Sequence, residues 1–374
     1  MKRRQILDYG VTSALTASAL VACSQTVATN PTAQEAIQSL PSVRWRLAIA
    51  FPKSVDVLYG AAELVCQRVN QITSGKFVII PHAPGEIAEP LEVTDAVQEG
   101  RAECGFTASH FNSSKSPAFA FFSALPFGLN AQQQNAWLYH GGGLELMQKL
   151  YGKLGVKSIP LCNTGTQMGG WFRKEIKSID DLQGLKFRLL GLAAEVFRGV
   201  GGDPVEVPPT EIFSALEQGK LDGAEFIGPH DDEKLGLNRV APFYYYPGWW
   251  EPGTSQDLHI NMAAWEALPP EYQQILESVL AEVNIKTLAK YDALNGKALK
   301  KLQLQGTKLL SFSDEIMQAA QKTAFEIYED LARKEADFKE IYDNWKAFRE
   351  EIYQWHKVGE LSFTSFAIAN PVTP

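Results

Sequence analysis

The chain has many acidic, basic and imidazole side chains, but few of them stand at spacings that support catalysis. It contains no G-x-S-x-G, no H-E-x-x-H, no Walker loop and no G-x-G-x-x-G after an expected strand. The six histidines, at positions 82, 110, 140, 230, 259 and 356, lack the spacing of a metal site. These absences disfavour an enzyme without excluding one.

One arginine has the chemistry to hold an anion. In the expected strand 184–190, Leu185, Phe187 and Leu189 share one face, and Arg188 lies on the other face near the strand's end. A planar guanidinium holds a carboxylate through two parallel, charge-assisted hydrogen bonds, which lysine cannot copy. Taken alone, an arginine on a strand is more often simply solvated.

An acidic cluster, His230-Asp231-Asp232-Glu233, is the other polar feature of note. Four adjacent residues cannot all face one ion, so a solvated loop and helix cap is the preferred interpretation.

The elements that must position these residues form two similar units. The first reads as strand 43–50, helix 57–72 ending at Thr73-Ser74-Gly75, strand 77–80, helix 91–99 and strand 102–107. The second reads as strand 184–188, helix 193–200, strand 203–207, helix 211–218 and strand 221–227. Strands that alternate with helices predict parallel sheets with helical crossovers, an α/β fold. Two such lobes would bind a ligand in the cleft between them.

The remainder of the chain is mostly helical. Apolar spacing predicts helices over 271–304, 314–332 and 338–356. The last carries an aromatic and apolar stripe that could pack on its own domain or on a partner subunit: Ile341, Trp345, Phe348, Ile352 and Trp355.

The N-terminal segment has the pattern of an export signal. Lys2, Arg3 and Arg4 precede an apolar run, 10–22, which is shorter than the roughly 20 residues of a membrane-spanning helix. Leu20-Val21-Ala22-Cys23 resembles a bacterial lipoprotein cleavage site, which predicts a signal peptide over 1–23 and lipid on Cys23. Arg3-Arg4 also permits twin-arginine export, leaving the export route open. Residues 24–43 are expected to form a flexible tether.

Composition narrows the class of protein further. A hydrophobic fraction of 45% and a net charge of −8 describe an ordinary globular chain without a basic patch for nucleic acid. Cys66, Cys104 and Cys162 stand among apolar neighbours or without C-x-x-C spacing, so buried thiols are expected rather than disulfides, with one pair left open.

Several longer motifs stand in a fixed order along the chain: Asn163 with Gln167-Met168-Gly169-Gly170-Trp171-Phe172-Arg173, Gly184 to Arg188, Asp222 to Pro229, and Trp250-Glu251-Pro252-Gly253. They resemble the solute-binding proteins of tripartite ATP-independent periplasmic (TRAP) transporters, closest to the branch that binds 2-oxo acids such as pyruvate with a metal ion. The likeness covers nearly all of the expected folded chain. It implies a two-lobed periplasmic-binding-protein fold with a long C-terminal helix.

The resemblance assigns roles to individual residues. It implies that Arg188 clamps the substrate carboxylate, with Arg173 as a second arginine near the cleft. It also implies a metal bound by Gln167, Glu225, Glu251 and the main-chain carbonyl of Phe226. The rest of the substrate pocket would include Asn163, Trp171 and Phe111, together with the apolar walls Trp249 and Trp250.

The implied metal ligands are all oxygens, which suit a hard cation such as sodium or calcium and disfavour zinc or copper. Two glutamates and a monocarboxylate carry three negative charges against one positive charge on Arg188. A divalent ion would neutralise this set and a monovalent ion would leave one negative charge, so the identity of the metal stays open.

The likeness further implies lobe I over 44–166 plus about 254–288, lobe II over 167–253 plus about 289–332, and a C-terminal dimerisation segment over 333–374. In that branch, the segment Asp343 to Arg349 resembles a helix exchanged between the subunits of a homodimer. The expected partners are a small organic acid and the small and large membrane subunits of a transporter. The expected location is the periplasm, with a lipid anchor to the membrane.

Two departures from the branch leave the ligand open. Residues 109–115 are more polar than the branch leads one to expect, and Phe226 stands where a tryptophan is familiar. Lys115 could serve a second carboxylate, as in glutamate, and lactate is a further alternative. A sensory protein and an exported metal-dependent lyase or hydrolase using Glu225 and Glu251 are the alternatives from other classes.

Overall fold

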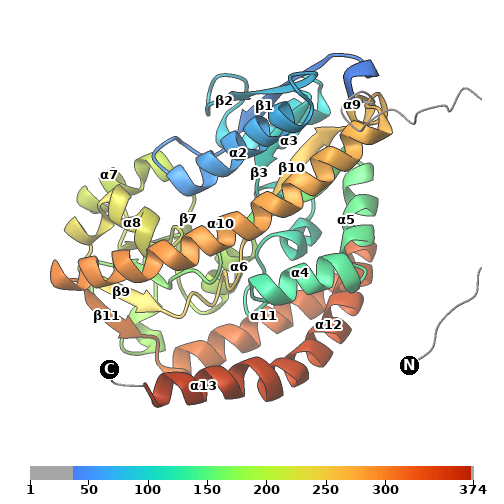
Figure 1. Ribbon diagram of the computed structural model, residues 1–374. Coiled ribbons are helices and arrows are strands. Elements are labelled where there is room, and N and C mark those ends of the chain that lie inside the picture. Colours follow the sequence, from blue (N-terminus) through green and yellow to red (C-terminus); the bar gives the residue numbers. More distant parts are fainter. Residues whose placement is uncertain (1–36, 372–374) are drawn as a thin grey trace, which may run out of the picture.

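Two β-sheets, one in each lobe, organise the residues that the computed structural model describes, 37–371 (Figure 1). The strand order is β2-β1-β3-β10-β4 in the first sheet and β11-β9-β5-β8-β6-β7 in the second. The strands of the first sheet are β1 (Val43–Ile49), β2 (Phe77–His82), β3 (Cys104–Thr107), β4 (Val156–Asn163) and β10 (Ser255–Asn261). Those of the second are β5 (Gly170–Phe172), β6 (Lys186–Arg188), β7 (Asp203–Val205), β8 (Gly223–Ala224), β9 (Phe243–Tyr246) and β11 (Lys308–Ser311).

The first sheet is mixed rather than parallel. In β1 the exposed Arg44 and Arg46 alternate with the buried Trp45 and Leu47, as the sequence predicts. The strand pairs in parallel with β2 and β3, whereas β10 runs antiparallel to both β3 and β4. The three strands of the predicted strand-helix unit are therefore parallel, as expected, and the sheet becomes mixed because β10, which returns from the other lobe, runs in the opposite direction.

The second sheet is also mixed. Strands β6, β7 and β8 are parallel, as predicted, but β5 runs antiparallel to β8 and β9. The run Phe243–Tyr246 forms strand β9 within this sheet. Its Tyr244 is fully buried and stacks on Trp171 with ring centroids 3.9 Å apart.

One long helix joins the two lobes. Helix α10 (Pro270–Leu304) packs against β4 and α2 of the first lobe and against α8 of the second, and crosses the molecule diagonally in Figure 1. The other α-helices are α2 (Asp56–Ile72), α3 (Val93–Gln98), α4 (Ala131–His140), α5 (Gly143–Gly152), α6 (Gly191–Gly199), α7 (Ile212–Glu217), α8 (Pro229–Leu235), α9 (Met262–Glu266), α11 (Asp314–Lys334), α12 (Ala336–His356) and α13 (Ser362–Ala369).

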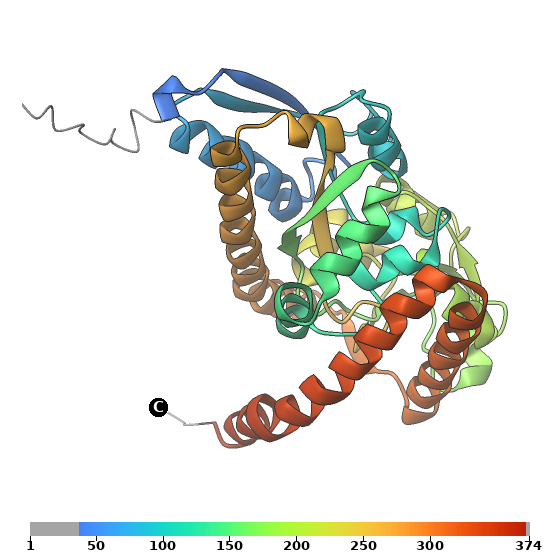
Figure 2. The ribbon, with the colours of Figure 1, turned by 90° about the vertical axis from the view of Figure 1, so that its right-hand side faces the viewer.

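The apolar stripe on α12 divides into two parts. Trp345 is buried against Phe121, with ring centroids 5.6 Å apart, and Ile341 is buried beside it. Trp355 at the far end is 62% exposed. From there the chain continues as a π-helical turn, η7 (Lys357–Leu361), into α13, and Figure 2 shows this helix projecting from the body.

The described residues settle two smaller questions. Cys66, Cys104 and Cys162 are buried free thiols. None of the helices within 37–371 combines the length and the apolar character needed to cross a membrane. The predicted lipidation site, Cys23, and the predicted signal peptide lie outside the described residues.

Candidate ligand-binding site

The site begins where two neighbouring parallel strands end. Arg188 is the last residue of β6, and it pairs in register with Ala224, the last residue of β8. The expected strand 221–227 therefore stops early, and Glu225 leaves the sheet beside Arg188. Parallel strands place their carboxyl ends at one edge of a sheet, which brings these two side chains together.

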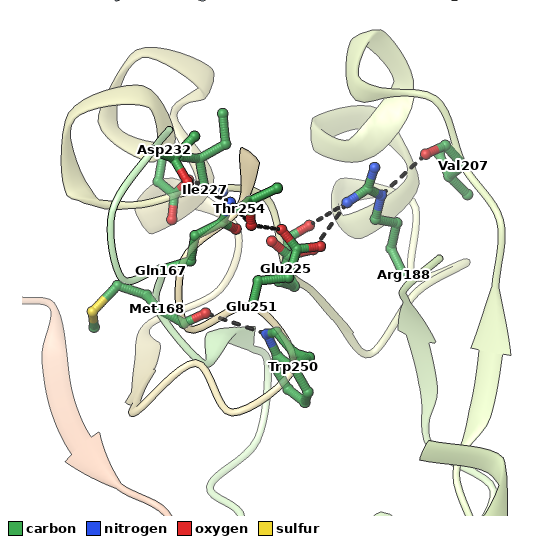
Figure 3. Close-up of polar contacts among 11 residues, drawn as sticks. Gln167, Met168, Arg188, Val207, Glu225, Ile227, Asp232, Trp250, Glu251 and Thr254 are labelled. Carbon is green, nitrogen blue, oxygen red and sulfur yellow. Dashed lines mark hydrogen bonds and ion pairs between the residues drawn. The ribbon is translucent and has the colours of Figure 1, made fainter. Parts of the chain in front are cut away.

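Arg188 and Glu225 form a buried ion pair. The guanidinium Nη1 donates to the Glu225 carboxylate at 3.1 Å and to its main-chain oxygen at 2.9 Å, and Nε donates to the main-chain oxygen of Val207 at 3.2 Å. Nη2 has no hydrogen-bond partner among the described residues, and no dashed line reaches it in Figure 3. The guanidinium is therefore fixed in place, and its Nη2 remains available to donate to a ligand carboxylate.

Two segments that cross between the lobes supply the other polar groups. Gln167 lies between β4 and β5, Glu251 lies between β9 and β10, and the Gln167 main-chain N–H donates to the Glu251 main-chain oxygen at 3.2 Å. Gly248 permits this approach, because a Cβ at that position would lie 2.4 Å from the Gln167 main-chain oxygen.

Thr254 fixes the orientation of both side chains. Its hydroxyl donates to the Glu251 carboxylate at 2.5 Å and accepts from the Gln167 amide nitrogen at 2.9 Å (Figure 3). The Gln167 amide nitrogen also donates to Thr164 at 3.0 Å. As a result, the Gln167 amide oxygen is buried without a hydrogen-bond partner, and so is Oε1 of Glu225.

These orphaned oxygens fit a cation. Buried polar atoms are normally hydrogen-bonded, and an ion can take the place of the missing donor. Burial raises the pKa of Glu225 well above its ordinary value, with the neighbouring Glu251 charge adding to the effect and Arg188 opposing it. Burial also raises the pKa of Glu251. Two buried carboxylates with oxygen neighbours form the donor set that a hard cation prefers.

The polar groups face a cavity of about 350 Å³ between the lobes. Its lining includes Arg188, Gln167, Glu225, Glu251 and Thr254, while Phe51, Leu58, Phe111, Leu190 and Phe226 contribute apolar walls. A wider groove of about 900 Å³ adjoins it, but none of these five polar residues lines that groove. The smaller cavity is therefore the candidate site, with a volume typical of a small-molecule pocket, about 300–1,000 Å³.

One imidazole lines the cavity in its neutral form. His110 is buried, and its Nδ1 lies 2.9 Å from the Ser123 hydroxyl. Burial, reinforced by the Arg188 charge, lowers the pKa of His110 to about 3. Arg188 is consequently the one permanent positive charge among the described residues that line the cavity.

Five residues assigned to the pocket or its walls by resemblance lie outside its lining. Asn163 is buried and accepts from the Gly165 main-chain N–H at 2.8 Å, which shapes the crossing segment. Trp171 is buried in the core of the second lobe, and Arg173 is exposed at the protein surface. Trp249 and Trp250 are likewise buried beyond the cavity wall.

Lys115 also lies away from the cavity. Its ammonium forms an ion pair with Asp95 at 2.5 Å on the surface of the first lobe, so it offers no contact for a second carboxylate. Conversely, no motif in the sequence indicates Thr254, Gln256 or Glu206, which line the cavity. Their positions depend on how the crossing segments meet, which local patterns do not encode.

The interpretation of residues 230–233 as a solvated loop is wrong for its central acids. Asp232 is buried and accepts from the Trp171 indole at 2.9 Å and from the Tyr244 hydroxyl at 2.7 Å. Its other oxygen accepts from the Ile227 main-chain N–H at 3.2 Å, so it anchors the segment that carries Glu225 (Figure 3).

A second group of metal-ligating side chains, Asp56, His230 and Asp231, already contacts a lysine. Carboxylate oxygens of Asp56 and Asp231 and an imidazole nitrogen of His230 lie within 4.8 Å of one another. The Lys234 ammonium already contacts Asp56, and His230 lies 3.0 Å from the same oxygen. This cluster is therefore an ion pair between α2 and α8.

Comparison with known proteins identifies the family. Residues 50–335 match the model of the bacterial extracellular solute-binding proteins, family 7. The chain belongs to this family. A monocarboxylate 2-oxoacid-binding periplasmic protein of Nostoc sp. (strain PCC 7120) is 51% identical over 367 residues, covering 98% of this chain and 99% of that protein.

Two solved structures are also similar. A TRAP transporter solute-binding protein from Bordetella bronchiseptica RB50 is 44% identical with a TM-score of 0.87, covering 88% of this chain and 98% of that one. It is a mixed-occupancy dimer with copurified calcium and picolinate in one site. A TRAP periplasmic solute-binding protein from Pseudoalteromonas atlantica T6c, with bound sodium and pyruvate, is 33% identical with a TM-score of 0.84, covering 87% and 99%.

These likenesses confirm the TRAP solute-binding resemblance and the two-lobed α/β fold with a long C-terminal helix. The family 7 proteins are extracytoplasmic binding proteins of transporters, so this chain is a binding protein and not an enzyme. The exported lyase or hydrolase, kept open on sequence grounds, is excluded by the family.

Proposed function

We propose that this family 7 protein captures a small 2-oxo monocarboxylate, such as pyruvate, together with one metal ion, and delivers it to the small and large membrane subunits of a TRAP transporter. Two relatives support the choice of ligand: the Nostoc protein is named for monocarboxylate 2-oxoacids, and the Pseudoalteromonas structure holds sodium and pyruvate.

One observation of this chain carries the proposal. One small cavity is lined by Arg188, whose Nη2 is free, and by Gln167 and Glu225, each of which has a buried oxygen without a hydrogen-bond partner among the described residues. In the proposed complex, Arg188 holds the carboxylate, and Gln167, Glu225, Glu251 and the Phe226 carbonyl hold the metal. A 2-oxo acid offers a carboxylate oxygen and an adjacent keto oxygen, which together chelate a hard cation.

A cation is needed on electrostatic grounds. Glu225 and Glu251 would both repel an anionic ligand, and Arg188 neutralises only one charge. Calcium and sodium are the proposed ions, since each accompanies an acid in a similar structure.

The proposed test is thermal unfolding of the purified protein with a panel of acids: pyruvate, lactate, glutamate and 2-oxobutyrate, each with and without calcium or sodium. A ligand at a hundredfold excess over its dissociation constant adds about 2.7 kcal/mol to the free energy of unfolding. We expect the midpoint to rise with pyruvate or 2-oxobutyrate only when the metal is present.

Other outcomes would revise the proposal in defined ways. A metal-independent shift with pyruvate would remove the metal from the mechanism. A shift with glutamate or lactate alone would keep the binding protein and reassign its ligand. The absence of a shift with every acid would contradict the proposed ligand class.

We also propose that the lobes close on the ligand, with lobe I over 44–166 plus about 254–288 and lobe II over 167–253 plus about 289–332. The cavity supports this, because residues of both sheets contribute to its wall. Such a pair of lobes closes by hinge motion. Small-angle scattering should give a smaller radius of gyration with ligand and metal than without.

Two further proposals concern assembly. The segment 333–374 forms a homodimer, supported by the exposed apolar residues of α13. Cys23 carries the lipid that holds the protein at the membrane outside the cytoplasm, on the strength of the sequence pattern alone. Replacing Cys23 by Ala should move the protein from the membrane fraction to the soluble fraction of the producing cell.

A further inference from the structure

The cavity carries a group of carboxylates that the proposed binding chemistry leaves unused. Glu89, Glu92 and Glu206 line the cavity at its exposed rim, in addition to the buried Glu225 and Glu251. Glu89 and Glu92 come from the first lobe, around a short helical turn, and Glu206 follows β7 of the second lobe. We call these three residues the acidic rim.

No basic side chain of the described residues neutralises the acidic rim. Within the described chain, none of the three carboxylates pairs with a lysine or arginine. The basic residues nearby have other partners: Lys115 pairs with Asp95 at 2.5 Å, and Arg198 in the adjoining groove pairs with Glu195 at 2.7 Å. Arg188, the one positive charge of the cavity lining, faces Glu225.

The backbone beside the rim is stiff. Pro90 stands between the two glutamates of the first lobe, and Pro208 follows Glu206 after one residue. Proline fixes one backbone torsion, so these segments have few alternative conformations in which to withdraw the carboxylates. The backbone that carries the three carboxylates therefore stays at the rim.

We infer that the acidic rim is a specificity filter, which rejects 2-oxo acids that carry a second carboxylate. The inference rests on the proposed function, because it assumes that Arg188 and the metal hold the first carboxylate. A second carboxylate in a cavity of about 350 Å³ then lies within reach of like charges and finds no free cation. A monocarboxylate has no charge in its tail and escapes the repulsion.

The test compares two ligands that differ chiefly in the second carboxylate. 2-Oxoglutarate and 2-oxopentanoate share a carbon chain, but the latter ends in a methyl group. Their dissociation constants are measured with calcium present, by calorimetry and by competition, for the wild type and for Glu89→Gln/Glu92→Gln/Glu206→Gln. Glutamine keeps the size of each exposed side chain, and unfolding curves confirm that the variant is folded.

We expect the wild type to bind 2-oxopentanoate more tightly and the triple variant to narrow the gap by about tenfold, equivalent to about 1.4 kcal/mol. Binding of 2-oxopentanoate itself should change by less than about twofold, since it carries no tail charge. Added salt should narrow the gap in the wild type more than in the variant, because it screens exposed charges.

A matched control removes a charge just outside the cavity. Glu211→Gln changes an exposed glutamate that lines neither the cavity nor the adjoining groove. The inference is overturned if the triple variant leaves the gap unchanged, or if Glu211→Gln narrows it equally. If the wild type binds neither pyruvate nor 2-oxopentanoate, the proposed function is overturned, and this inference with it.

Discussion

At the scale of single residues, the Arg188 guanidinium is held from two sides before any ligand arrives. Nη1 contacts the Glu225 carboxylate and main chain, and Nε contacts the Val207 main-chain oxygen. A lysine has one nitrogen on a flexible stem and cannot make these contacts while also meeting a ligand. The proposed clamp therefore requires the shape of the guanidinium as well as its positive charge.

Arg188→Lys should weaken binding of pyruvate by roughly 100-fold, the cost of losing charge-assisted hydrogen bonds worth about 1.5–3 kcal/mol. Calorimetry with calcium present measures the loss. Arg198→Lys is the matched control, because that exposed arginine pairs only with Glu195. Equal affinity of Arg188→Lys and wild type would refute the clamp.

Glu251, a proposed metal ligand, lowers the stability of the protein when no metal is bound. Its carboxylate is buried near that of Glu225, and the two like charges repel. Glu251→Gln should raise the unfolding midpoint without metal by about 1–3 °C while removing the shift that calcium produces. The exposed Glu217→Gln serves as control. A calcium shift that persists in Glu251→Gln would exclude this residue as a ligand.

At the scale of elements, a short 3₁₀ helix, η2 (Ser109–Asn112), holds the wall of the cavity. Its Ser109 hydroxyl donates to the Asp257 carboxylate on β10 at 2.5 Å and lies 2.7 Å from the Tyr151 hydroxyl. The next two residues, His110 and Phe111, line the cavity. Asp257 thus fixes the position of the cavity wall formed by His110 and Phe111.

Burial raises the pKa of Asp257 to about 8, with only the Ser109 hydrogen bond opposing the shift. The groups near it carry no compensating charge: Tyr151 and Cys162 are neutral, and burial lowers the pKa of the neighbouring His259 to about 3. The folded protein therefore holds a proton on Asp257 that the unfolded chain has lost above about pH 4.

Stability should accordingly fall as pH rises from about 4 to about 8, with a slope of at most about 1.4 kcal/mol per pH unit from this group. Asp257→Asn should flatten the pH dependence of the free energy of unfolding over that window. Urea unfolding at several pH values measures it. A variant whose curve keeps the wild-type slope would show that Asp257 is ionised in the folded state.

The elements also show what the sequence could predict. Helix α2 was expected over 57–72 and spans Asp56–Ile72, because its apolar face and its Gly75 stop are local signals. Strands β4 and β5 were not expected, since their residues are almost all buried and show no alternation. Local patterns likewise do not reveal that β10 pairs antiparallel with β3 and β4.

The site divides in a similar way. The strand-end motifs led to Arg188 and Glu225, which the structure places in contact. The same motifs suggested Trp171 and Arg173, but the Trp171 indole on β5 is buried in the core, and Arg173, one residue beyond the end of the strand, is exposed. A sequence motif does not reveal which face of a strand each of its residues occupies. The acidic rim combines residues of both lobes, so no local motif reveals it either.

At the scale of the whole molecule, the C-terminal helix is anchored along part of its length. Tyr353 donates to the Gly128 main-chain oxygen at 2.7 Å, and His356 is buried with its Nδ1 3.1 Å from the Gln133 amide. Beyond that point, a groove of about 660 Å³ opens between α12, η7 and the body.

The helix beyond this anchor is apolar but exposed. Phe363, Phe366 and Ile368 of α13 are each more than two-thirds exposed, an unusual concentration for a single chain in water. A second copy that presents the same helix and groove could cover both in a symmetric pair. This is the physical case for the proposed homodimer.

Phe363→Ser/Phe366→Ser/Ile368→Ser should therefore convert a dimer into a monomer, as measured by light scattering on a sizing column at micromolar concentration. Pyruvate affinity should stay within about twofold, because the substituted residues do not line the cavity. Leu304→Ser, which removes an exposed apolar residue on α10, is the control and should stay dimeric. A wild-type protein with the mass of a single chain would contradict the dimer, and α13 would then need another partner to cover its apolar surface.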